Sequence, residues 1–176
     1  MKKDAIRKMK WFWPWQDARE EAWLEEMSKQ GLHLKQPHIW GEYEFIKSLP
    51  KSYLYRLDFR DSMKQKDKDA YVRLFTDLGW EHIGEVNGWQ YFRREANPGD
   101  PQELYTDADS KIQKYNRLLT WLGLMYPSYL VIFIALWSEY PEWAMWLTVG
   151  IILTTSAVWL LITAKIWQRI RQLKKL

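Results

Sequence analysis

Apolar residues recur with a helical period in two segments of the first half of the chain, residues 17–30 (DAREEAWLEEMSKQ) and residues 69–78 (DAYVRLFTDL). Each segment gathers its apolar side chains on one face, which is the pattern of an amphipathic helix packed against a core. A glycine follows each segment, and glycine is the usual residue just past a helix end. The first segment also begins with Asp17 and Glu20 in capping-box spacing. The pattern therefore predicts two short helices with one buried face each.

Short apolar runs with an alternating pattern surround both helices and predict strands. They cover residues 9–13, 32–35, 40–47, 53–60, 80–86 and 89–95. Asn87 and Gly88 join the last two runs, and this dipeptide is the strongest short-range signal for a tight hairpin.

The two helix segments align with each other at an offset of 48 residues. At this offset Gly31 matches Gly79 and Tyr43 matches Tyr91. Such self-similarity indicates an internal duplication. We therefore expect an α+β domain over residues 1–96, built from two β-α-β-β units at about 8–47 and 52–95. The expected architecture is a ferredoxin-like variant in which both units share one mainly antiparallel sheet and the helices cover one face.

The last third of the chain is strongly apolar. Residues 97–117 form a linker and juxtamembrane helix, since Asn97-Pro98-Gly99-Asp100-Pro101 cannot continue a strand or a helix. Residues 118–137 and 144–167 are each long enough to cross about 30 Å of hydrocarbon as a helix. The sequence predicts a two-helix transmembrane hairpin over residues 118–167 and a basic tail over residues 168–176.

Basic residues flank both predicted spans on one side, whereas the connecting loop carries only Glu139 and Glu142. By the positive-inside rule the protein is expected to be a two-pass protein of the cell membrane with both termini cytoplasmic. Within the spans, Pro127 is expected to kink the first helix, and Gly150 and Thr154 supply an edge of small residues for packing. The lipid bilayer is the expected partner, together with a protein partner or a second copy bound through the hairpin.

Charge and composition exclude several function classes. The formal net charge is +4, but residues 1–110 carry 18 basic and 20 acidic residues, so no basic stripe is available for nucleic acid. The chain has no cysteine, which excludes thiol catalysis and cysteine metal sites. No nucleophile elbow, phosphate loop or metalloprotease pattern is present. We expect no catalytic residue, no cofactor and no metal site; the alternative is a metal pair formed by His33 and His82 in corresponding strands.

Aromatic residues are numerous for so small a domain, at 16% of the chain. We expect most of them in the core, where each ring buries a large area. The alternative is a surplus on the surface that forms a stacking or lipid-facing patch.

Three polar residues of the predicted sheet form a candidate interaction surface. Alternation places Arg56 and Asp58 on the sheet face opposite Tyr55, and Glu81 lies within reach of the pair. The alternative is an ordinary ion pair that faces solvent or a helix.

A second candidate lies in the segment ELYTDADSK, where the charged domain gives way to the apolar spans. Thr106 and Asp109 have capping-box spacing, and acids in a first helical turn complement the helix dipole. We expect this segment to start the helix that becomes the first span and to couple the domain to its anchor. The residues of this candidate coupling segment are Glu103, Tyr105, Thr106, Asp107, Asp109 and Ser110. A metal or headgroup site formed by its carboxylates is the alternative.

Several short motifs resemble an uncharacterised domain-of-unknown-function family of membrane proteins in Gram-positive bacteria, commonly encoded beside PadR-type repressors. The motifs are Glu21-Ala22-Trp23-Leu24, Met27, Gly31, Tyr55-Arg56-Leu57-Asp58, Gly79-Trp80-Glu81, Tyr91-Phe92-Arg93 and Glu103-Leu104-Tyr105-Thr106-Asp107 with Ser110. The ELYTD..S string is the most specific of them. The resemblance implies no reaction or ligand, and it implies a role in envelope stress or drug response only by association.

The expected function is that of a membrane-anchored, non-enzymatic sensor, regulator or accessory protein at the cytoplasmic face. One alternative is a membrane-surface enzyme acting on lipid headgroups or phosphates, which needs Glu103, Asp107 and Asp109 to converge with Arg56 or Arg93 around a metal. The other alternative is a small oligomeric export component.

Overall fold

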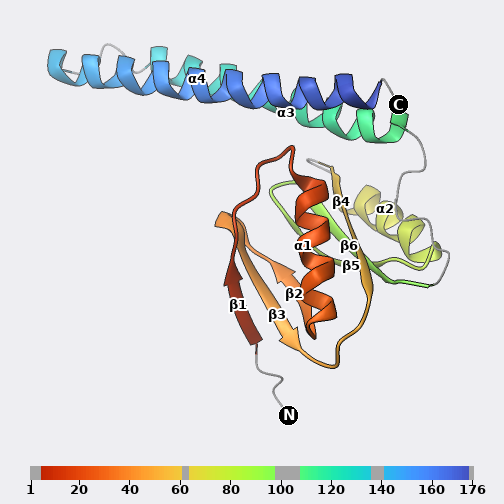
Figure 1. Cartoon of the computed structure of the whole chain (residues 1–176). Coiled ribbons are helices and arrows are strands. Elements are labelled where there is room, and N and C mark those ends of the chain that lie inside the picture. Colours follow the sequence, from red (N-terminus) through yellow and green to blue (C-terminus); the bar gives the residue numbers. More distant parts are fainter. Residues whose placement is uncertain (1–4, 61–63, 98–107, 136–140, 175–176) are drawn as a thin grey trace. The chain divides into compact units, whose positions relative to one another are not determined.

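The computed structural model describes residues 5–60, 64–97, 108–135 and 141–174, and the chain divides into one unit of residues 1–110 and one of residues 111–176 (Figure 1). The first unit contains, in chain order, β1 (Ala5–Met9), α1 (Asp17–Lys29), β2 (Leu32–Pro37), a 3-10 turn (Ile39–Gly41), β3 (Glu42–Lys47), β4 (Tyr53–Phe59), α2 (Gln65–Asp77), β5 (Glu81–Val86) and β6 (Trp89–Glu95). The second unit holds most of α3 (Ala108–Ala135) and all of α4 (Glu142–Leu173). The α+β class is confirmed.

The strands form two antiparallel sheets of three, in the orders β1-β3-β2 and β4-β6-β5. The expectation of one shared sheet is therefore wrong. The edge strands β2 and β5 lie next to each other, but no ladder joins them. Side chains of the second sheet bind the backbone of β2 instead: Tyr55 Oη accepts a hydrogen bond from Leu34 N at 3.3 Å, and Arg93 Nη1 donates one to Leu34 O at 3.0 Å.

The duplication is visible in the structure. α1 and α2 begin and end at residues related by the offset of 48, and the two sheets have the same strand order. Both edge strands also carry an irregularity at the same place, between Leu34 and Gln36 in β2 and between His82 and Gly84 in β5. The two units are thus copies of one supersecondary motif.

The two helices cover different faces of the second sheet, contrary to the prediction that both lie on one face. α1 packs on a core that includes Tyr55 and Leu57 of β4 as well as residues of the first sheet. α2 packs through Phe75 on Phe92, with ring centroids 4.4 Å apart. Neighbouring residues of a strand point to opposite faces, so β4 and β6 are buried on both sides. Figure 1 shows α1 beside β4 and α2 on the other side of that strand.

α1 also protects the free edge of β4. Leu57 N donates a hydrogen bond to Glu21 Oε1 at 2.8 Å, Tyr55 N donates to Glu25 Oε1 at 3.3 Å, and Tyr53 N donates to Ser28 Oγ at 3.4 Å. Residues spaced by three or four along a helix advance about 4.5–6 Å, close to the advance of about 6.6 Å for two residues of a strand. The helix therefore supplies one hydrogen-bond acceptor for every second amide along the free edge of β4. In a sheet without such a cover, these amides would be open to pairing with another strand.

Two predicted boundaries differ from the structure. The first strand was expected over residues 9–13 but covers Ala5–Met9, because its partner β3 begins at Glu42, opposite Met9. α2 begins at Gln65 rather than at residue 69, because its first turn holds charged residues that carry no apolar period. The β5–β6 hairpin is as predicted: Asn87 and Gly88 have φ values of 49° and 81°, the left-handed conformation that a tight turn of this type requires.

The second unit contains two helical segments that are long and apolar enough to cross a membrane, Lys111–Ala135 and Ala144–Leu173. Their apolar side chains are largely exposed within the chain. The helices contact each other through Tyr126, whose hydroxyl bonds Ser156 Oγ and whose ring stacks on Trp159 at 5.0 Å. Trp159 Nε1 also donates a hydrogen bond to Leu122 O at 3.2 Å.

The three packing candidates of the spans have different surroundings. α3 continues through Pro127. Thr154 donates its hydroxyl to Gly150 O at 2.9 Å within α4. A Cβ atom at Gly150 meets no atom within 4 Å, so α3 does not pack on this edge.

Candidate functional site

A groove of about 670 Å³ lies where the two repeats meet, between the edge strands β2 and β5. Its walls come from β2, the 48–51 loop and β5, with side chains of β3, β4 and β6 between them. The volume falls in the range of sites for small organic molecules. Its polar lining residues are His33, Lys35, Ser48, Lys51, Tyr53, Glu81, His82 and Arg93.

Arg93 is the most firmly held cation of the groove. Its Nε and Nη2 atoms donate to the two carboxylate oxygens of Glu81 at 2.7 and 3.0 Å, and its guanidinium lies 4.9 Å from the ring centroid of Tyr53. Burial lowers the pKa of Arg93, but the hydrogen bonds and the charge of Glu81 more than offset this, so the net pKa is raised. A guanidinium fixed in this way is a pre-organised donor for an anion.

Two lysines add positive charge to the walls of the groove. Lys51 Nζ lies 2.6 Å from Glu95 Oε2, and this hydrogen bond raises the pKa of the lysine. Lys35 Nζ lies 2.6 Å from Glu44 Oε1 and lowers the pKa of that glutamate. Glu44 and Glu95 do not line the groove, so its lining carries three cations and one carboxylate, Glu81. Each of the three cations is nevertheless paired with a glutamate of the same domain.

Both histidines of the groove are hydrogen-bonded. His33 Nε2 lies 2.9 Å from Leu49 O, and His82 Nε2 lies 2.9 Å from Gln90 Oε1. Burial lowers the pKa of His82, which keeps its ring neutral near neutral pH. Within the described ranges, no three side chains of the metal-binding kind converge, so the histidines have no third ligand there.

A buried carboxylate on α1 joins the two repeats from within the core. Glu20 Oε1 accepts hydrogen bonds from Tyr43 Oη at 2.8 Å and from Tyr91 Oη at 2.6 Å. Burial raises the pKa of Glu20, and the two tyrosine hydrogen bonds oppose that shift. The capping-box interpretation of this residue is wrong, since no side chain caps α1.

Sequence reasoning missed this role of Glu20, although a signal was present. Glu20 lies on the same helical face as Leu24 and Met27, so it is a carboxylate on the apolar side of an amphipathic helix. Such a residue needs a hydrogen-bond partner in the core. Tyr43 and Tyr91, which occupy equivalent positions in the repeat alignment, are the two partners that the structure shows.

Arg56, Asp58 and Glu81 do not form one exposed surface. Arg56 is buried and binds Glu25 at 2.8 Å, and Asp58 is fully buried and accepts a hydrogen bond from Tyr71 Oη at 2.8 Å. Both β4 side chains are covered because α2 packs on their sheet face and Glu25 of α1 closes the edge. Glu81 instead pairs with Arg93 and belongs to the groove.

The candidate coupling segment lies almost wholly outside the described residues. Glu103, Tyr105, Thr106 and Asp107 are not described, and of Asp109 and Ser110 only the helical backbone is described, in the first turn of α3. The enzyme alternative needs Glu103 and Asp107 of this segment, so the described residues do not test it.

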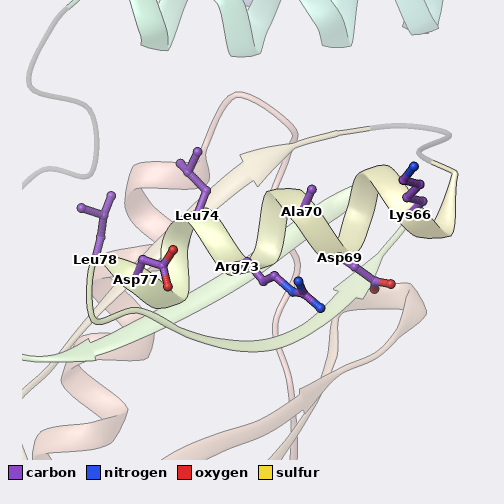
Figure 2. Close-up of a pocket in the computed structure, with 7 residues that line it drawn as sticks. All are labelled: Lys66, Asp69, Ala70, Arg73, Leu74, Asp77 and Leu78. Atoms are coloured by element: carbon purple, nitrogen blue, oxygen red, sulfur yellow. The ribbon is translucent and has the colours of Figure 1, made fainter.

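A second hollow lies on the outer face of α2, but it lacks a second wall among the described residues. Figure 2 shows its lining, which comes from one helix alone: Lys66, Asp69, Ala70, Arg73, Leu74, Asp77 and Leu78. Two basic and two acidic residues balance each other there. The groove at the repeat junction is therefore the better candidate site, because several strands enclose it and its lining carries three cations and one carboxylate.

Comparison with known proteins adds a family and no activity. The family model described as "Protein of unknown function (DUF2812)" matches residues 16–126. No curated protein matches, and no solved structure matches.

Proposed function

The chain belongs to the DUF2812 family, and from that premise we propose that it is a membrane-anchored, non-enzymatic sensor whose groove at the repeat junction binds a small organic anion. The observation that carries the proposal is the groove itself, with Arg93, Lys51 and Lys35 around one lining carboxylate. The ligand carries an acidic group for these cations and a flat or apolar part for the wall beside Tyr53.

The second unit supports the anchoring part of the proposal. Two long helices with largely exposed apolar side chains are suited to a hydrocarbon environment. Basic residues flank these helices, whereas the loop between them carries two glutamates. The sensor domain is therefore proposed to lie on the cytoplasmic side of the cell membrane.

Position between the repeats supports a sensing role. The two sheets meet at β2 and β5 through side-chain hydrogen bonds to Leu34 rather than through a strand ladder. A ligand that contacts both strands gains interactions from both repeats at once, and it stabilises the state in which the repeats are closed. A partner protein or a second copy binds that closed state. Envelope stress or drug response is the proposed biological setting.

Thermal unfolding of the full chain in nanodiscs tests this function with naphthoate as the probe. Naphthoate has a carboxylate and a flat apolar ring system, and naphthamide is its neutral counterpart. We expect naphthoate to raise the midpoint temperature in a concentration-dependent way and naphthamide to leave it unchanged.

The variant Lys51→Gln removes one groove cation and is expected to weaken the effect on the order of tenfold. Lys66→Gln removes a lysine of α2 outside the groove and serves as the matched control. An equal shift with naphthamide, or an undiminished shift in Lys51→Gln, contradicts the assignment of the groove as an anion site.

A further inference from the structure

Five large apolar side chains stand exposed on two neighbouring segments of the first unit. Met9, Trp11 and Trp13 come from the end of β1 and the segment after it, and Ile39 and Trp40 come from the turn before β3. The exposed fractions are 78% for Met9, 56% for Trp11, 41% for Trp13, 55% for Ile39 and 75% for Trp40. We call these residues the tryptophan patch. Tryptophan seldom leaves most of its ring in water without a partner for it.

Hydrogen bonds hold the two segments together. Lys10 N donates to Gly41 O at 2.8 Å, and a Cβ atom at Gly41 stands 2.6 Å from Lys10 O. Only glycine tolerates this approach at a φ of 73°. The two segments that carry the patch thus lie side by side, although they are about thirty residues apart in the chain.

Backbone conformation and hydrogen bonds define the two segments that carry these indoles. Trp40 has a φ of 64° and a ψ of 22°, a left-handed conformation that is unfavourable for a bulky residue. Trp13 N donates to Gln16 Oε1 at 3.1 Å, and Gln16 N donates to Trp13 O at 2.8 Å. Phe12 points the other way and packs on Trp23, with centroids 5.7 Å apart. The loop therefore alternates, with Phe12 as its inner anchor and Trp11 and Trp13 outside.

The charge beside the patch is positive. Residues 5–16 contain Arg7, Lys8 and Lys10 and no acid. Glu42, on the adjoining β3, is already bound by Arg7 at 3.0 Å. Among the described residues no acid pairs with Lys8 or Lys10. Both lysines lie on the strand face opposite Met9, where Lys10 Nζ stands 5.0 Å from the ring centroid of Trp23, so they flank the patch from the other face of β1.

We propose that the tryptophan patch docks onto an anionic lipid surface, with its indoles at headgroup level and with Lys8 and Lys10 flanking them from the other face of the edge strand β1 and attracting lipid phosphates. Indole rings are enriched at this depth because they combine an apolar body with a polar N–H group. Each lysine near an anionic surface contributes attraction that weakens with salt. This contact is independent of the groove and its ligand. It lets the bilayer itself act as a second partner of the sensor domain.

Cysteine labelling tests the docking, because the chain has no cysteine of its own. Ile39→Cys places a nitrobenzoxadiazole label in the patch. Leu49→Cys places the same label at an exposed residue beyond the opposite end of β3. Both full-length variants are reconstituted in vesicles of phosphatidylcholine and in vesicles of equal parts phosphatidylcholine and phosphatidylglycerol. A nitroxide on the lipid acyl chains quenches only labels that reach the bilayer.

We expect quenching at position 39 and not at position 49, and stronger quenching with phosphatidylglycerol. Lys8→Gln combined with Lys10→Gln lowers the docking equilibrium on the order of tenfold. Trp11→Ala combined with Trp13→Ala abolishes the quenching, and circular dichroism confirms that this variant is folded. Equal quenching at both positions overturns the proposal. A different result is a label at position 39 that is shielded from water in both lipids and becomes exposed to water when the protein is diluted in lipid. That result also overturns the proposal, and it assigns the patch to contact between two copies.

Discussion

Tyr43 and Tyr91 occupy equivalent positions in the two repeats, and both donate hydrogen bonds to the same oxygen of Glu20. A single carboxylate on the first helix thereby ties the last strand of one repeat to the last strand of the other. The corresponding residue of α2, Lys68, binds Glu85 at 2.6 Å. The duplication is therefore symmetric in its backbone and asymmetric in the residue that joins its halves.

Glu20 makes the stability of the domain depend on pH. Its pKa is raised above the ordinary value of 4.5, so the folded chain binds this proton more tightly than the unfolded chain does. Below the pKa that Glu20 has in the unfolded chain, this proton contributes fully to the free energy of unfolding. The contribution is lost as the pH rises through the pKa that Glu20 has in the folded chain. We expect the free energy of unfolding of wild type, relative to that of Glu20→Gln, to fall across that window. Chemical unfolding of the full chain in nanodiscs over a pH series measures the difference.

Glu20→Leu removes the acceptor as well as the charge, and both buried tyrosine hydroxyls lose their partner. We expect a loss of about 2–6 kcal/mol in the free energy of unfolding, because each of the two unsatisfied buried donors costs about 1–3 kcal/mol. Glu26→Gln on the exposed side of α1 serves as the control and should change neither the stability nor its pH dependence. A flat pH profile for wild type argues against a titrating Glu20.

Glu25 is expected to be essential for the edge of β4. Its carboxylate accepts a hydrogen bond from Tyr55 N and pairs with the buried Arg56. Glu25→Ala leaves a buried charge without this partner, which costs about 3 kcal/mol or more. Removing both charges, in Glu25→Leu with Arg56→Met, should recover most of that loss in thermal or chemical unfolding. If the double variant is as unstable as the single one, the ion pair is not the source of the effect.

Gly31 and Gly79 provide a matched pair of substitutions, since each follows a helix with a φ of 80°. Alanine in this conformation costs about 1–2 kcal/mol at either site. At Gly31 a Cβ atom also stands 2.5 Å from Ser48 O, whereas at Gly79 it meets only Arg94 Cδ at 3.7 Å. Gly31→Ala should therefore lower the unfolding midpoint distinctly more than Gly79→Ala. Equal losses indicate that the 48–51 loop moves aside without cost.

Because the chain has no cysteine of its own, single introduced cysteines can measure the orientation of the two apolar helices in the membrane. Ser138→Cys, between the spans, should react with a membrane-impermeant maleimide added to intact cells, and Lys174→Cys should react only in inverted vesicles. The opposite pattern reverses the proposed topology.

Periodicity and the repeat alignment were enough to predict the elements, the duplication and the two apolar helices. They did not predict that the sheet is split, because strand periodicity does not tell whether the backbone of Leu34 pairs with another strand or binds side chains such as Tyr55 and Arg93. Strand alternation correctly placed Arg56 and Asp58 on one face. It could not show that Tyr71 and Glu25 bury them there.

The groove was also beyond sequence reasoning. Lys51 and Arg93 are 42 residues apart, and only the docking of the two repeats brings them to one cavity. The tryptophan patch was anticipated only as the alternative of a lipid-facing surplus, because composition does not tell which rings are buried. Tyr43, Tyr91 and Phe92 are buried, whereas Trp11 and Trp40 are exposed.

Amide hydrogen exchange tests the central claim most directly, because it locates the ligand on the chain. The full-length protein in nanodiscs is compared with and without naphthoate. We predict slower exchange in β2, in residues 48–53 and in β5, the segments that line the groove. Unchanged exchange in these segments, or protection confined to α3 and α4, contradicts the assignment of the repeat junction as the sensor site.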